Sequence, residues 1–258
     1  MARFAKFLAA GLVVVIAGVV WKGNQAYRAA ADDFVPRATR FVAPSVVDGH
    51  ETMTLVTKGG LHIAASFVPP KNEVVVLLGH GSESSRVQLW GDLELLAKAG
   101  FGVLVLDWPG NGESEGPIKL GTPEREAFTA AVDFLSARPD VKRIGAYGFS
   151  QGGGLLTMFV ADEPRVTSLL AVNAWSDKVS QMRYGWKRLG EVQELPVEWA
   201  TRANVEGGNA NALAAAPKLK GKKTLFIASC ADEVVPPSNS SELATAAAGD
   251  LQTATGAS

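Results

Sequence analysis

Five short apolar runs occur along the chain from residue 74 onward, at residues 74–78, 102–106, 143–147, 166–172 and 223–228. Their apolar residues are nearly continuous, which is typical of parallel strands covered on both faces. Segments with helical spacing lie between and after them, at 85–98, 123–137, 151–161 and 239–248. This strand–helix rhythm predicts an α/β protein with a doubly wound, mostly parallel sheet.

Two alternating segments precede these runs and predict a hairpin. Residues 52–56 and 61–67 alternate between apolar and other positions, and Gly59-Gly60 interrupts them. Such a hairpin forms one antiparallel edge of the sheet. In doubly wound sheets the ligand site lies beyond the carboxyl ends of the strands, so the residues that follow the five runs are the candidates for chemistry.

The N-terminal end has a different pattern. Residues 7–21 carry no charge and follow Arg3 and Lys6, as in a membrane anchor or signal sequence. We therefore expect an anchor at 1–22, a linker at 23–47 that contains Pro36 and Pro44, and a folded domain at 48–258. The charge bias places the domain outside the cytoplasm, bound to the membrane by its N-terminal segment. The alternative is a secreted or periplasmic protein cleaved near residues 29–31.

Composition narrows the choice of partners. The formal net charge is −1, which gives no electrostatic reason to expect a nucleic acid partner. One cysteine and three histidines do not favour a metal site, and there is no phosphate-binding G-x-x-x-x-G-K-[ST] motif. We expect no cofactor.

The strongest motif is the G-x-S-x-G sequence Gly148-Phe149-Ser150-Gln151-Gly152, which lies between a predicted strand and a predicted helix. In this setting the motif predicts a nucleophile elbow with Ser150 on a strained turn. The N-terminus of the following helix favours negative charge beside the serine. A glycine-rich turn with an ordinary serine is the alternative.

A second motif, Gly79-His80-Gly81-Ser82, follows the strand at 74–78. Its backbone predicts one half of an oxyanion hole, with the Ser82 amide and the Gln151 amide as the two donors. His80 is expected to orient this loop rather than to act as a base. A plain strand-to-helix turn is the other interpretation.

The candidate triad acid is Asp232, which follows the strand at 223–228. A triad acid orients a histidine, and the order serine, acid, histidine along the chain is that of α/β-hydrolases. Asp177, after the strand at 166–172, is the rival. A capping aspartate in a turn would also explain Asp232.

Together these residues resemble the α/β-hydrolase superfamily, and within it the Bem46-like serine hydrolases, many of which carry an N-terminal membrane segment. The resemblance covers residues 50–257 and includes the His80-Gly81 pair, the loop at 106–114 (LDWPGNGES), Gly121, the Ser150 elbow and the Asp232 loop. It implies a broad esterase-like role and a catalytic histidine after the last strand.

The chain departs from this pattern in its histidines. His50, His62 and His80 all precede Ser150. We therefore expect a serine esterase or thioesterase that ends before its base, with an incomplete final strand and helix. Such an end would leave the strand at 223–228 as a partly unpaired edge and expose apolar surface on the sheet. The alternative is a complete, non-catalytic binding module of the same fold.

About 50 residues separate the strands at 166–172 and 223–228, which predicts a small cap at 175–221. The cap contains Trp175, Trp186, Trp199, Met182, Tyr184 and Leu189. An aromatic, partly apolar cap favours an acyl ester or thioester as the small-molecule substrate over a polar sugar. These residues would equally serve to pack the cap onto the core, and the sequence does not fix the physiological substrate or the oligomeric state.

Overall fold

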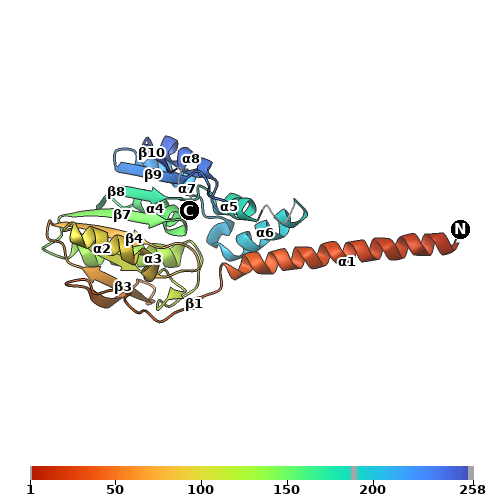
Figure 1. Cartoon of the computed structure of the whole chain (residues 1–258), viewed down its shortest axis with the longest axis horizontal. Coiled ribbons are helices and arrows are strands. Elements are labelled where there is room, and N and C mark those ends of the chain that lie inside the picture. The colour runs from red at the N-terminus through yellow and green to blue at the C-terminus, as the bar shows by residue number, and fades with distance from the viewer. Residues whose placement is uncertain (1, 187–190, 255–258) are drawn as a thin grey trace.

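The computed structural model describes residues 2–186 and 191–254, and of residues 2–16 and 191–193 it describes the backbone only. An eight-stranded sheet organises the domain (Figure 1), with the order β10-β9-β8-β7-β4-β5-β3-β2. Only the pairs β2–β3 and β3–β5 are antiparallel. The strands are β2 (Glu51–Val56), β3 (His62–Val68), β4 (Val74–Gly79), β5 (Gly102–Leu106), β7 (Arg143–Phe149), β8 (Val166–Val172), β9 (Lys223–Ser229) and β10 (Asp250–Ala254). The predicted mostly parallel sheet with a hairpin at one edge is confirmed.

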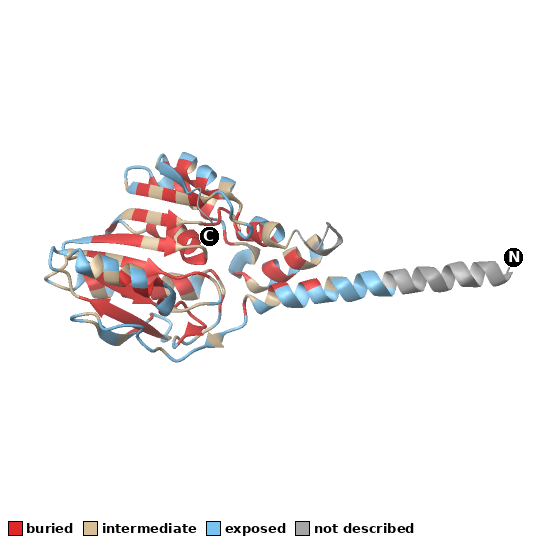
Figure 2. Cartoon of the chain, viewed as in Figure 1, coloured by how far each residue is buried: buried red, intermediate tan, exposed pale blue. Residues whose placement is uncertain are grey.

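Helices cover the two faces of this sheet unequally. On one face, α3 (Thr122–Ser136), α4 (Gln151–Val160) and α8 (Pro237–Ala247) enclose the main core with the inward side chains of the strands. On the other face, η1 (Arg86–Leu89) and α2 (Trp90–Lys98) cover β4 and β5. Both faces of β4 and β5 are therefore buried (Figure 2), which explains their continuous apolar runs.

A cap interrupts the alternation between β8 and β9, as the length of that connection predicts. It consists of α5 (Lys178–Gly185), α6 (Glu191–Asn204), η3 (Glu206–Gly208), α7 (Ala212–Ala215) and η4 (Ala216–Leu219). Trp175 is buried, whereas Trp199 is 61% exposed and does not serve the core. Leu189 lies outside the described residues.

The N-terminal segment forms one helix, α1 (Ala2–Asp32), which projects from the domain (Figure 1). The prediction of a linker from residue 23 is wrong, because the helix continues to Asp32 and its end packs along α6. Ala26 and Ala30 are buried there against Met182, Val197 and Ala200. Short two-residue strands follow at β1 (Arg37–Ala38) and its parallel partner β6 (Asn111–Gly112). Among the residues that the structure describes, no helix combines the length and apolar character that a membrane crossing requires.

The C-terminal edge corrects another expectation. The strand β9 is not left unpaired, because β10 runs parallel to it over five residue pairs from Asp250–Leu225 to Ala254–Ser229. The prediction was wrong because residues 250–254 suffice to pair most of β9. The residues of β10 are themselves exposed, so β10 is the edge strand.

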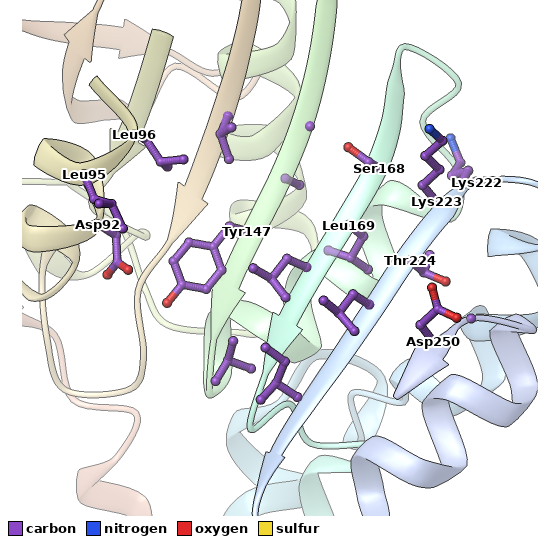
Figure 3. A pocket seen from close by; sticks show the side chains of 18 of the residues that line it. Asp92, Leu95, Leu96, Tyr147, Ser168, Leu169, Lys222, Lys223, Thr224 and Asp250 are labelled. Atoms are coloured by element: carbon purple, nitrogen blue, oxygen red, sulfur yellow. The ribbon is translucent and has the colours of Figure 1, made fainter. Parts of the chain in front are cut away.

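The predicted apolar surface on the sheet is present. Beyond α2, no helix among the described residues covers the face of β7, β8 and β9 that points away from the main core, and this face forms a groove of about 860 Å³. Figure 3 shows Leu95 and Leu96 of α2 on one side of the groove and Lys222, Lys223 and Asp250 on the other. Tyr147 and Leu169 lie between them.

Candidate active site

Ser150 lies on the turn between β7 and α4, at the carboxyl edge of the sheet. Its backbone has φ 51° and ψ −114°, in a region that non-glycine residues rarely adopt. The Ser150 amide donates to the carbonyl of Val172 at 2.8 Å, and the Ser150 carbonyl accepts from the Gly154 amide at 3.2 Å. These contacts hold the strained turn in place, as in the predicted nucleophile elbow.

The glycines of the motif are required by close backbone contacts. A Cβ atom on Gly152 would lie 2.0 Å from the carbonyl oxygen of Gly79, and one on Gly148 would lie 2.5 Å from the backbone of Gly152. The turn therefore fits against β4 only without side chains at these two positions. This proximity brings the loop after β4 beside Ser150.

That loop carries the second predicted motif. A Cβ atom built on Gly81 would lie 3.4 Å from Ser150 Cβ, so the loop and the serine are in contact distance. Ser82 Oγ donates to Gln151 Oε1 at 2.8 Å, which joins the loop to the start of α4. The Gly81 amide donates to Gln88 Oε1 and is occupied. Among the described hydrogen bonds the amide of Ser82 has no acceptor, as an oxyanion donor requires.

His80 is fully buried and holds this loop through both ring nitrogens. Its Nδ1 is 2.7 Å from the carbonyl of Gly81, and its Nε2 accepts from the Trp108 amide at 3.0 Å. These contacts fix the neutral form with the proton on Nδ1. Burial lowers the pKa of His80, which stabilises the same neutral form. A ring bonded at both nitrogens orients the loop and has no position left for a serine proton.

The two candidate acids differ in how much of each carboxylate is already bonded. Asp232 Oδ1 accepts from the amides of Val234 and Val235, each at 2.8 Å, while Oδ2 has no partner among the described residues. In Asp177, one oxygen caps α5 by accepting from the Ser180 amide and the other accepts from Asn209 Nδ2. Asp177 thus serves the cap, and only Asp232 keeps an oxygen available for a histidine.

A cavity of about 330 Å³ opens at Ser150. Its lining contains Gly81 and Ser82 from the oxyanion loop and the predicted cap residues Trp175, Met182 and Trp186. It also contains residues that the sequence did not indicate. These come from the cap (Lys178, Gln181 and Gly185), from the end of α1 and the turn that follows it (Ala29 and Asp33) and from the Asp232 loop (Val234). Lys178 Nζ is 3.1 Å from Asp33 Oδ2 in a nearly buried ion pair.

No local pattern marks Lys178 or Asp33 as site residues. They are 145 residues apart and meet only because α1 packs on the cap. In the sequence, Lys178 is one of several polar residues around the start of a helix, and Asp33 lies in the segment that was expected to be a linker. Only the tertiary structure shows that both line the serine cavity.

None of the three histidines lines this cavity. His62 is exposed on β3, where its Nδ1 is 2.9 Å from Glu115 Oε2. His50 packs edge-on against Trp90, with ring centroids 4.9 Å apart. The described side chains also include no cluster of acidic, histidine or cysteine residues that could hold a metal ion.

A match to a protein-family model identifies the fold that carries these residues. A model described as the alpha/beta hydrolase fold matches residues 74–193, a span that contains both the Gly79–Ser82 loop and Ser150. The chain has the α/β-hydrolase fold. The mostly parallel sheet and its flanking helices, described above, agree with this fold.

Comparisons with individual proteins agree with this fold. The uncharacterized protein PA2218 of Pseudomonas aeruginosa is 32% identical over 132 residues, which are 47% of this chain and 36% of that protein. The chain thus spans little more than a third of the length of this curated relative. Among solved structures, the Pyrococcus furiosus esterase Pf2001 superposes with a TM-score of 0.72 at 20% identity, covering 86% of this chain and 89% of the esterase. Acetyl xylan esterase 1 from Thermoanaerobacterium sp. JW/SL YS485 gives 0.59 at 18% identity, covering 90% and 85%.

Proposed function

We propose that this chain hydrolyses carboxylic esters or thioesters through an acyl-enzyme on Ser150. The observation that carries the proposal is the strained turn that holds Ser150. Ser150 lies beside the Ser82 loop, immediately before the N-terminus of α4, and lines a cavity. The similarity to esterases supports the same class of reaction.

The chemistry follows from these positions. Ser150 Oγ attacks the acyl carbon, and the carbonyl oxygen becomes an oxyanion that accepts from the Ser82 and Gln151 amides. The tetrahedral intermediate collapses, the bond to the leaving alcohol or thiol breaks, and the serine proton is transferred to that group. Water then attacks the acyl-serine, releases the carboxylic acid and returns a proton to Ser150.

Both proton transfers need a base that the three histidines do not supply. His80 is bonded at both nitrogens, and none of the three lines the cavity. The free Oδ2 of Asp232 is available to orient an imidazole. Without that imidazole the serine is a poor nucleophile near neutral pH.

Chemical rescue tests this arrangement. With the protein present, added imidazole should hydrolyse a short-chain p-nitrophenyl ester about tenfold faster than the same imidazole does without protein. This gain is a part of the ~10² to 10⁴-fold that a positioned base contributes. The rescued rate is measured against Ser150→Ala, which should remove it completely. An equal response of Ser150→Ala and the unmodified chain would overturn the proposal.

The same experiment addresses a second candidate, a non-catalytic binding module of this fold. This candidate is favoured by two observations. Both ring nitrogens of His80 are already hydrogen-bonded, and no histidine lines the cavity. The binding module would be supported if imidazole produces no Ser150-dependent turnover while the chain still binds a ligand.

We also propose that α1 tethers the domain to a membrane, with the domain outside the cytoplasm. The uncharged run at residues 7–21 supports the proposal, and most of it lies where only the backbone is described. The full-length protein should remain in the pellet after high-salt and carbonate washing of membranes. Its recovery in the soluble fraction would contradict the tether and favour cleavage and secretion.

A further inference from the structure

The cavity at Ser150 has a wall of buried polar atoms that lack protein partners. Trp175 and Gln181 both line it, and both are at least 95% buried. Trp175 Nε1 has no acceptor, and Gln181 Oε1 has no donor although its Nε2 donates to the carbonyl of Val234 at 3.1 Å. Buried polar groups are normally paired, and both residues border the cavity, so a ligand in the cavity is a nearby source of the missing partners.

Lys178 adds further unmet donors to the same wall. Its side chain is only 2% exposed, and an ammonium group has three N–H donors. One described acceptor, Asp33 Oδ2, is within reach. A buried cation with unused donors is costly unless a ligand or water accepts from it.

Charge balance limits the kind of partner that fits. Asp33 already neutralises Lys178, and Glu83, also in the lining, is paired with Arg37 at 2.5 Å. A carboxylate entering the cavity would be attracted by Lys178 and repelled by Asp33 and Glu83. A neutral oxygen accepts from Lys178 or Trp175 without that repulsion, and a hydroxyl can also donate to Gln181.

We propose that Lys178, Trp175 and Gln181 are specificity-determining residues that recognise a hydroxyl group on the acyl chain, so that the preferred substrates are esters of hydroxy acids. The inference rests on the proposed acyl transfer at Ser150, since it assigns the cavity to the acyl group. It refines the expectation of an aromatic, partly apolar cap, because the indole Nε1 of the aromatic Trp175 has no acceptor.

Binding of unreactive amides tests the inference independently of catalysis. Pentanamide is compared with 3-, 4- and 5-hydroxypentanamide in titrations of the full chain followed by saturation-transfer NMR. At least one hydroxyamide should bind about tenfold more tightly than pentanamide, as expected for a hydrogen bond to a charged donor. Equal affinity across the whole series would overturn the proposal.

Variants then identify the recognising groups. Lys178→Met keeps the length of the side chain without its charge and should abolish the tenfold preference. Trp175→Phe keeps most of the ring without the N–H donor and should reduce the preference. It serves as the test if Lys178→Met does not fold. Lys98→Met, at a side chain that is 78% exposed, is the matched control and should retain it. A preference that survives in folded Lys178→Met and Trp175→Phe would show that these residues do not recognise the hydroxyl.

A second readout separates this inference from the proposed function. Ser150 is tested with a fluorophosphonate probe in the presence of imidazole, with Ser150→Ala as the blank. A hydroxyamide preference without labelling would leave the binding site standing and remove the hydrolase. Labelling without any preference would leave the hydrolase standing and remove the hydroxyl site.

Discussion

His80 couples the oxyanion loop to pH, because it is buried with both nitrogens bonded. Protonation of Nε2 would place a proton where the Trp108 amide already donates. Burial lowers the pKa of His80 below the value near 6.5 of an unfolded chain. Below about pH 6.5 the unfolded chain therefore binds a proton that the folded chain rejects, and the free energy of unfolding decreases as the pH falls through this window.

The melting temperature should accordingly decrease when the pH is lowered from 7.5 to 5.5. The variant His80→Gln should be less stable at pH 7.5, since it disturbs two buried hydrogen bonds, but should lose less stability over the same pH range. Burial also lowers the pKa of His50, so a smaller slope should remain. Thermal denaturation at the two pH values measures both effects. A slope in His80→Gln as steep as in the unmodified chain would exclude His80 as its source.

At the scale of elements, the elbow depends on how closely α4 approaches β4. Gly152 meets backbone oxygens, which cannot move aside as flexible side chains do. The variant Gly152→Ala should therefore destabilise the fold by at least about 3 kcal/mol, at the upper end of overpacking effects. Gly91→Ala is the matched control, because nothing lies within 4 Å of the added methyl group on α2. It should be stabilising by up to about 1 kcal/mol. Urea denaturation compares the two, and similar effects would contradict the close approach.

The elements were largely predictable because each leaves a local pattern. The strands β4, β5, β7, β8 and β9 are visible as apolar runs, and Ser150 is visible because its glycines follow from the backbone geometry of the turn. The end of α1 was missed because its alanines, Ala26 and Ala30, resemble a linker until α6 is placed against them.

The wall of the cavity was missed for a related reason. Trp175 was predicted to belong to the cap, but whether its N–H finds a partner depends on side chains far away in sequence.

At the scale of the whole molecule, the two sides of β9 meet different surroundings. Phe226 is fully buried in the main core, whereas its neighbour Leu225 lines the groove on the opposite face. Contiguous apolar surface of this kind promotes association. The groove is therefore expected to dominate the solution behaviour of the chain.

Substitutions at these two neighbouring positions should separate folding from association. Leu225→Gln should leave the melting temperature within a few degrees of its original value and reduce self-association, as measured by analytical ultracentrifugation. Phe226→Gln should prevent folding, because it buries an amide in the core. If Leu225→Gln associates as strongly as the unmodified chain, the groove is not the surface responsible.

The junction between α1 and the cap has a consequence for processing. The residues at which a signal peptidase would cut, 29–31, belong to a helix whose Ala30 is buried against the cap. Ala29 lines the serine cavity, and Asp33, two residues beyond the cut, holds Lys178. Cleavage would remove one wall of the cavity and place a new positively charged amino terminus close to Asp33, in competition with Lys178. If the chain were cleaved there, processing would change the wall of the serine cavity, and the cleaved and uncleaved forms would bind different ligands in it.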